Sequence, residues 1–181
     1  MSGAATVGGD DRLRLFLALE LPDETIRVLH RWSQDHVPVG RALGAFHVTL
    51  AFLGAQPRAS IGAIVDVLRR EAAATEPFAL GVARYRETRS VGMLVLDDPS
   101  RGARSLAERV QQGLEDVGVY ERERRSWLPH VTVVRFRERL RLAPPLPRTG
   151  TFVPSGAAAF LSRLHPSGAR YEVLESCSIG R

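Results

Sequence analysis

The sequence predicts an α+β protein with mainly antiparallel sheets. The expected order of elements is strand, helix, strand, helix, two strands, helix and three strands. Consecutive strands of this kind favour hairpins over a doubly wound parallel sheet, in which strands and helices alternate. A short pattern, His-Val-Thr followed by Leu or Val, occurs once in each half of the chain. We therefore expect two similar lobes related by a pseudo-two-fold axis.

The strands are predicted from apolar, β-branched stretches. These stretches lie at residues 13–19, 46–53, 78–84, 91–96, 130–136, 157–164 and 170–176. Two of them, FHVTLAFLG and WLPHVTVVRF, contain the repeated pattern and predict buried strands.

The helices are predicted at residues 23–35, 59–74 and 100–117. Acidic residues fill the first turn of the first helix, as the helix dipole favours. In the second, Ser60 is the expected N-cap and apolar residues follow at helical spacing. The third carries its apolar residues on one face and is expected to end at Gly118.

The two histidine–threonine motifs, residues 47–50 and 130–133, carry the groups best suited to catalysis. Side chains on a strand alternate between faces, so the His and Thr of each motif point the same way. The apolar residues around them are expected on the opposite face: Val48, Leu50, Phe52, Val131 and Val133. Two imidazoles and two hydroxyls around a small anion would suit acid–base chemistry on a phosphate ester. A lone strand histidine is usually structural, but the repetition disfavours that alternative.

Composition excludes several other kinds of chemistry. The chain has 181 residues, of which 44% are hydrophobic and 25% charged, which fits one globular domain spanning residues 1–181. There is no lysine, so a P-loop lysine and a Schiff-base lysine are excluded. The single cysteine, Cys177, excludes an intramolecular disulfide and a cysteine-based zinc site. A net charge of +5, carried by arginine, fits a polyanionic partner.

The chain shows no export or membrane signal. No apolar run is long enough to cross a bilayer, and the small, acidic stretch at residues 1–11 is expected to be a flexible N-terminus. We therefore expect a cytoplasmic protein that is monomeric and does not associate with membranes.

Four segments together resemble a known family. They are RLFLALELP at 14–22, HVTLAFLG at 47–54, PHVTVVRF at 129–136 and SRLHPSGARYEVL at 162–174. The paired motifs resemble those of the two-histidine phosphoesterase superfamily. The flanking segments are similar to the bacterial and archaeal RNA 2′,3′-cyclic phosphodiesterases, the LigT-like branch.

This resemblance implies a bilobal fold in which two mainly antiparallel sheets flank a central cleft, with helices on the outside. It also implies hydrolysis of RNA 2′,3′-cyclic phosphate ends to a 2′-phosphate, without a metal or other cofactor. Some members are also described as joining tRNA halves through a reversible 2′,5′ linkage. The resemblance assigns His130 as the base and His47 as the acid, with Thr49 and Thr132 donating to the phosphate. The residues alone leave the two histidine roles interchangeable.

Three further residues are candidates for substrate binding. Arg135 would point away from His130 in a regular strand, and would reach a phosphate only if the strand ends or bulges. Otherwise a structural ion pair is expected. Phe46 and Trp127 flank the motifs and could stack a terminal base, although a place in the core is the alternative for each. Tyr171, in the C-terminal segment, is expected to be structural.

Two arginine-rich stretches, residues 122–125 and 137–141, bracket the second motif. They could follow an RNA backbone, or they could form a solvated face together with the glutamates interleaved among them. The remaining histidines, His30, His36 and His165, form no metal-ligand pattern.

Two other functions remain open from the residues. One is a non-catalytic module that binds RNA ends. The other is a phosphodiesterase for a different small cyclic or 2′,5′-linked nucleotide. Steep salt dependence of substrate affinity would favour RNA over a mononucleotide.

Overall fold

A computed structural model describes residues 12–37, 41–42, 45–163 and 169–180. The segment 1–11, expected to be flexible, and His165 lie outside the described residues. No helix in the described part of the chain is both long enough and apolar enough to cross a membrane.

The strands and helices follow the predicted order. They are β1 Arg12–Glu20, α1 Asp23–His36, β2 Arg41–Ala42, β3 His47–Pro57, η1 Arg58–Ser60, α2 Ile61–Ala73, β4 Leu80–Glu87, β5 Val91–Asp97, α3 Gly102–Asp116, β6 His130–Arg135, β7 Thr151–Phe152, β8 Gly156–Arg163 and β9 Arg170–Cys177. Each expected element is present within a few residues of its predicted bounds. The elements missed by the sequence analysis are short: β2 and β7, of two residues each, and the single 3-10 turn η1.

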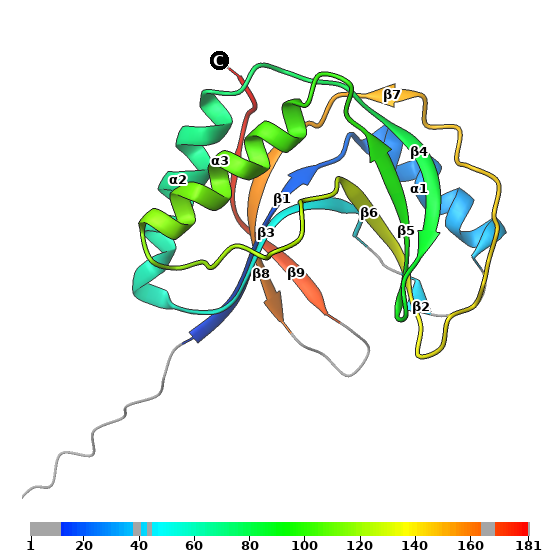
Figure 1. The fold of residues 1–181 in the computed structure, drawn as a ribbon, viewed down its shortest axis with the longest axis horizontal. Coiled ribbons are helices and arrows are strands. Elements are labelled where there is room, and N and C mark those ends of the chain that lie inside the picture. The colour runs from blue at the N-terminus through cyan, green and yellow to red at the C-terminus, as the bar shows by residue number, and fades with distance from the viewer. Residues whose placement is uncertain (1–11, 38–40, 43–44, 164–168, 181) are drawn as a thin grey trace, which may run out of the picture.

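The strands form one curled antiparallel sheet in the order β7-β4-β5-β6-β3-β1-β8-β9, with β2 beside β6. Its two halves curve around a central space, with β1, β3, β8 and β9 on one side and β4, β5 and β6 on the other (Figure 1). The halves meet where Val48 of β3 pairs with Val131 of β6. The predicted α+β class is confirmed, and the two expected sheets are the halves of this continuous sheet.

The helices lie on the outer faces of the sheet, as the resemblance implies. Helix α2 packs against β8 and β9, and α3 packs against β3 (Figure 1). Helix α1 lies against the other half, where the ring of Trp32 is 6.5 Å from that of Tyr85 on β4. Leucines from the strands and helices, such as Leu17, Leu68 and Leu114, are fully buried between these layers. The inner, concave face of the sheet is left for the site.

Strand β3 bulges at Leu50, the last residue of its histidine–threonine motif. Thr49 pairs with Ala18 of β1 and Ala51 pairs with Leu17, so Leu50 has no partner in this ladder. Leu50 and Ala51 are both buried, which breaks the alternation of faces. An unpaired extra residue has this effect because the residues that follow it are turned to the other face.

Strand β6 bulges at the corresponding place. Thr132 pairs with Met93 of β5 and Val134 pairs with Gly92, so Val133 is left out of the ladder. Val133 and Val134 are both buried. The two motif strands therefore share one backbone irregularity, three residues after each motif histidine.

The bulge corrects one prediction from the sequence. A regular alternation places Phe52 on the core face with Val48, but the side chain of Phe52 is 53% exposed on the concave side. The buried Gln111 of α3 donates a hydrogen bond to the carbonyl of Leu50 at 2.8 Å. A side chain from the neighbouring helix thus satisfies a backbone group that the bulge removes from the ladder.

Candidate active site

The pairing of β3 with β6 brings the two histidine–threonine motifs together. Val48 lies opposite Val131, and both are buried on the core face. In an antiparallel pair, the neighbours one step away lie opposite each other on the other face. His47 is therefore beside Thr132, and Thr49 is beside His130. All four side chains are partly exposed on the concave face.

A cleft of about 860 Å³ opens over this face of the sheet. Thr49, His130, Thr132 and Arg135 line it from the motif strands. Its remaining walls come from β4, β5, α3 and the loop before β6, and include aromatic and basic side chains. Such a mixed lining suits a nucleotide, which presents a flat base and an anionic phosphate.

His47 is set among aromatic rings rather than in the cleft lining. Its imidazole lies 4.8 Å from the ring of Phe16, 6.0 Å from Phe160 and 5.5 Å from Tyr171, measured between centroids. These rings come from β1, β8 and β9 and hold the imidazole from one side. Tyr171 meets His47 edge-on, so its structural role is to help position a candidate catalytic group.

The surroundings of His47 lower its pKa to about 4. Burial is the main cause, because it disfavours the charged imidazolium. A hydrogen bond with the backbone of Ala45 opposes the shift, while the positive charges of His130 and Arg135 add to it. His47 is therefore neutral at pH 7 in the unliganded protein, and a bound phosphate anion would raise its pKa.

The backbone just before β6 orients the imidazole of His130. Its Nδ1 lies 2.8 Å from the carbonyl oxygen of Leu128. A carbonyl can only accept, so this contact favours the tautomer with the proton on Nδ1. The Nε2 atom is then the nitrogen available to take a proton.

Arg135 lies on the same face as His130 because of the bulge at Val133. It is exposed, it lines the cleft, and its charge acts on His47. No ion pair of Arg135 is found within the described part of the chain, so the structural ion pair considered from the sequence is not seen there. Arg135 was expected to reach a phosphate only if the strand ends or bulges, and β6 does bulge at Val133.

The two aromatic candidates differ in their positions. Trp127 lines the cleft, and its indole N–H donates to the carbonyl of Thr49 at 2.9 Å, which ties the two motif segments together. Phe46 is only 4% exposed and packs against His30 at 4.8 Å between ring centroids. For Phe46, the structure favours the core alternative over base stacking.

Sequence reasoning missed Phe52 as a site residue. Its exposed ring lines the cleft, and the guanidinium of Arg14 lies 5.6 Å from the ring centroid. Phe52 follows His47 by five residues, just as Arg135 follows His130 by five. This shared spacing is the only signal in the sequence that could have suggested Phe52. The bulge that exposes Phe52 leaves no recognisable pattern in the sequence.

Comparison with known proteins places the chain in one family. Residues 17–161 match the 2′-5′ RNA ligase superfamily, and the chain belongs to it. A curated relative from Escherichia coli (strain K12), named RNA 2′,3′-cyclic phosphodiesterase, is 28% identical over 142 residues. That similarity covers 73% of this chain and 77% of the relative.

Solved structures share the fold along most of the chain. A protein from Thermus thermophilus superposes with a TM-score of 0.80 at 25% identity, covering 92% of this chain and 98% of that one. E. coli LigT in complex with 3′-AMP gives a TM-score of 0.79 at 23% identity, covering 94% of this chain and all of that one. The LigT-like fold implied by the resemblance is confirmed.

Proposed function

We propose that this protein hydrolyses 2′,3′-cyclic phosphate ends of RNA to a 2′-phosphate by metal-independent acid–base catalysis with His47 and His130. The pairing of Val48 with Val131 carries this proposal, because it places each histidine beside the threonine of the other motif. The name of the E. coli relative, RNA 2′,3′-cyclic phosphodiesterase, supports the choice of substrate.

In the proposed mechanism His130 acts as the base. Its Nε2 takes a proton from water while the water oxygen attacks phosphorus. The bond from phosphorus to the 3′ oxygen breaks, and His47 donates a proton to that oxygen. The product carries a 2′-phosphate and a free 3′-hydroxyl, and the two histidines have exchanged their protonation states.

Charge on the phosphate is balanced by groups that line the cleft. The hydroxyls of Thr49 and Thr132 donate to the non-bridging oxygens, and the guanidinium of Arg135 adds a fixed positive charge. These groups come from two adjacent strands of a sheet, which holds them in place before the substrate arrives.

The low pKa of His47 places a condition on this assignment. The acid must be protonated before reaction, whereas His47 is neutral at pH 7 without a ligand. In the proposal, the phosphate anion raises the pKa of His47 on binding, which also offsets the repulsion from Arg135. If the phosphate does not do so, His47 stays neutral and cannot supply the proton, and the two roles are exchanged.

The same groups permit ligation. A 5′-hydroxyl of RNA can take the place of water, so that attack on the cyclic phosphate leaves a 2′,5′ linkage and a free 3′-hydroxyl. We propose this as a second, reversible reaction, with tRNA halves as candidate substrates. Phe52 and Trp127 offer ring surfaces to the terminal base in both reactions.

The test is an assay of a short RNA that ends in a 2′,3′-cyclic phosphate, with EDTA present. The proposal predicts release of a 2′-phosphate despite the chelator. Binding without turnover would instead favour a non-catalytic module that recognises RNA ends. Turnover of cyclic mononucleotides or 2′,5′-linked nucleotides alone would point to a different small substrate.

A further inference from the structure

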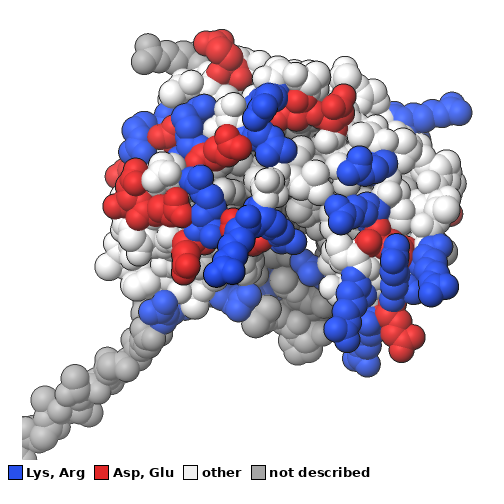
Figure 2. Space-filling view, in the orientation of Figure 1, with Lys and Arg blue, Asp and Glu red and all other residues white. Residues whose placement is uncertain are grey.

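An arginine-rich arm projects from the half of the sheet that contains β4, β5 and β6. We define this basic arm as residues 84–90, the end of β4 and its turn into β5, together with residues 136–142, which follow β6. It contains six arginines and two acids: Arg84, Arg86, Arg89, Arg137, Arg139, Arg141, Glu87 and Glu138. Basic side chains gather at the lower right of Figure 2, over this part of the fold, with few acidic ones among them.

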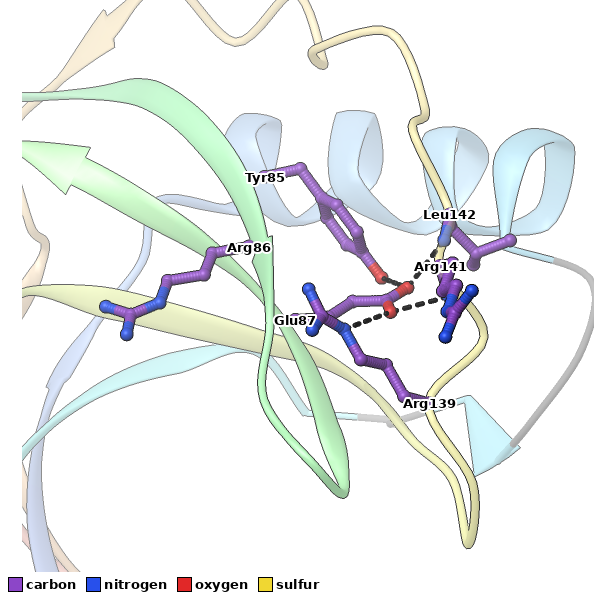
Figure 3. Close-up of a pocket in the computed structure, with 6 residues that line it drawn as sticks. All are labelled: Tyr85, Arg86, Glu87, Arg139, Arg141 and Leu142. Carbon is purple, nitrogen blue, oxygen red and sulfur yellow. Dashed lines mark hydrogen bonds and ion pairs between the residues drawn. The ribbon is translucent and has the colours of Figure 1, made fainter.

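Glu87 joins the two parts of the basic arm. Its carboxylate accepts hydrogen bonds from the backbone N–H of Arg141 at 2.7 Å, from that of Leu142 at 2.8 Å and from the hydroxyl of Tyr85 at 3.1 Å (Figure 3). The Nε of Arg139 lies 3.5 Å away. The loop after β6 is therefore held against β4 through a single buried carboxylate.

A second contact makes the arm continuous with the strands. The backbone N–H of Phe136 donates to the carbonyl of Ser90 at 3.0 Å. Arg141 adopts a left-handed backbone conformation, with φ of 56°, at the point where it binds Glu87. This conformation costs free energy for a residue other than glycine. The hydrogen bond to Glu87 therefore holds the backbone of the loop in place at Arg141.

The arm's positive charge is largely uncompensated. The side chain of Glu87 is only 2% exposed, and its carboxylate already accepts the hydrogen bonds described above. Across the described parts of the chain, Arg139 is the only arginine of the arm that forms an ion pair. The other arginine-rich stretch differs, because Arg122 pairs with Glu115 and Arg125 with Glu123.

The basic arm is contiguous with the catalytic cleft. Arg86 lines the cleft together with His130, and it also lines a second cavity of about 550 Å³ beside Arg139 and Arg141. Figure 3 shows Arg86 on the side of β4 away from Glu87, while Arg139 and Arg141 surround that carboxylate. A chain of phosphates that leaves the cleft would therefore meet further arginines beyond it.

We propose that the basic arm binds the sugar–phosphate backbone of single-stranded RNA on the 5′ side of the cyclic phosphate, so that the preferred substrate is an oligonucleotide. This deepens the proposed function and rests on it. Arginine suits the role because its guanidinium donates two parallel hydrogen bonds to a phosphate. Such contacts set affinity and position without reading the base sequence.

The experiment compares substrates of two lengths. The triple variant R137Q/R139Q/R141Q removes three charges from the arm, and the control R69Q/R70Q/R104Q removes three from helices α2 and α3. The Michaelis constant is measured at several salt concentrations for an RNA of about 12 nucleotides with a cyclic end, and for a cyclic mononucleotide.

For the long RNA we expect the arm variant to raise KM roughly tenfold at low salt. The slope of log KM against log salt should fall by about two, at about 0.7 for each lost phosphate contact. The cyclic mononucleotide lies in the cleft, which Arg137, Arg139 and Arg141 do not line, so the variant should turn it over as the wild type does. An unchanged KM and slope for the long RNA, or equal effects from the control variant, would overturn the proposal.

Two additions keep the test decisive. If the triple variant is unstable, R137E reverses one charge without touching the partners of Glu87, and should raise KM for the long RNA alone. If the wild type turns over neither substrate, the proposed function fails, and the arm is tested by fluorescence anisotropy with a 3′-phosphorylated RNA. Weaker binding by the triple variant would then support the arm, and equal binding would refute it.

Discussion

Phe52 and Arg135 occupy equivalent places on the two motif strands. Each follows its motif histidine by five residues, and each lines the cleft because the strand bulges at the third residue of that interval. The same kind of β-bulge in the two halves of the sheet thus exposes two different side chains to the cleft. One half offers an aromatic ring and the other a cation, which suits a ligand with a base at one end and a phosphate at the other.

Loss of the Arg135 guanidinium should weaken catalysis. We expect R135Q to lower kcat/KM for a cyclic phosphate by about 10- to 100-fold, because a hydrogen bond to a charged group contributes about 1.5–3 kcal/mol. R135K should recover part of the loss, since it keeps the charge but not the planar fork. R69Q, which removes an exposed charge from α2, serves as the control. Equal activity of R135Q and R69Q would remove Arg135 from the site.

The exposed ring of Phe52 should act on substrate binding rather than on stability. Stacking on a base contributes about 1–3 kcal/mol, so F52A should raise KM by roughly 5- to 100-fold with little change in kcat. Val173 on β9 is similarly exposed, at 50% against 53% for Phe52, which makes V173A a matched control. Both variants should unfold at nearly the same temperature. A KM for F52A equal to that of V173A would exclude stacking on this ring.

The titration of His47 should depend on the ligand. In the free protein its imidazole should titrate near pH 4, as its burial dictates. With a 2′-phosphorylated nucleotide bound, the anion should raise this pKa well above that value. NMR of the imidazole carbons, assigned with H47N, measures both states. A pKa that stays near 4 in the complex would assign His47 as the base and His130 as the acid.

Glu87 should make stability depend on pH. Burial alone would raise its pKa, but hydrogen bonds from the backbone of Leu142 and Arg141 and the Tyr85 hydroxyl, together with the charge of Arg139, lower it overall. A depressed pKa stabilises the folded state above the ordinary value near 4.5, and this stabilisation is lost as pH falls through the folded-state pKa.

The variant E87Q tests this through denaturant unfolding. It should cost about 2 kcal/mol at pH 7, because a charged acceptor of several hydrogen bonds is lost. The difference from the wild type should shrink at acid pH. E138Q, at an exposed neighbour in the arm, should have little effect at any pH. A pH-independent difference for E87Q would contradict the assigned pKa shift.

The sequence was informative where local pattern determines structure. Apolar periodicity located the strands and helices, and the repeated motif identified residues that the sheet then places side by side. It was least informative where one residue changes the register. The bulges at Leu50 and Val133 depend on partners in other strands and, for Leu50, on Gln111 of α3. A regular alternation therefore places Phe52 on the wrong face and leaves the face of Arg135 undecided.

The basic arm shows a similar limit. The sequence identified two arginine-rich stretches but could not tell a binding surface from a solvated face of paired charges. That distinction depends on which acids lie nearby in the fold. Glu115 is seven residues from Arg122, whereas Glu87 reaches Arg139 across 52 positions of the chain.

The most direct test of the central claim is the rate of cyclic phosphate hydrolysis by H47N and H130N with EDTA present. Each positioned histidine is expected to contribute about 10²–10⁴ to the rate, so each variant should lose at least about 99% of the wild-type turnover while remaining folded and able to bind RNA. A variant that keeps more than about a tenth of wild-type activity would contradict the role of its histidine, and with it the two-histidine mechanism.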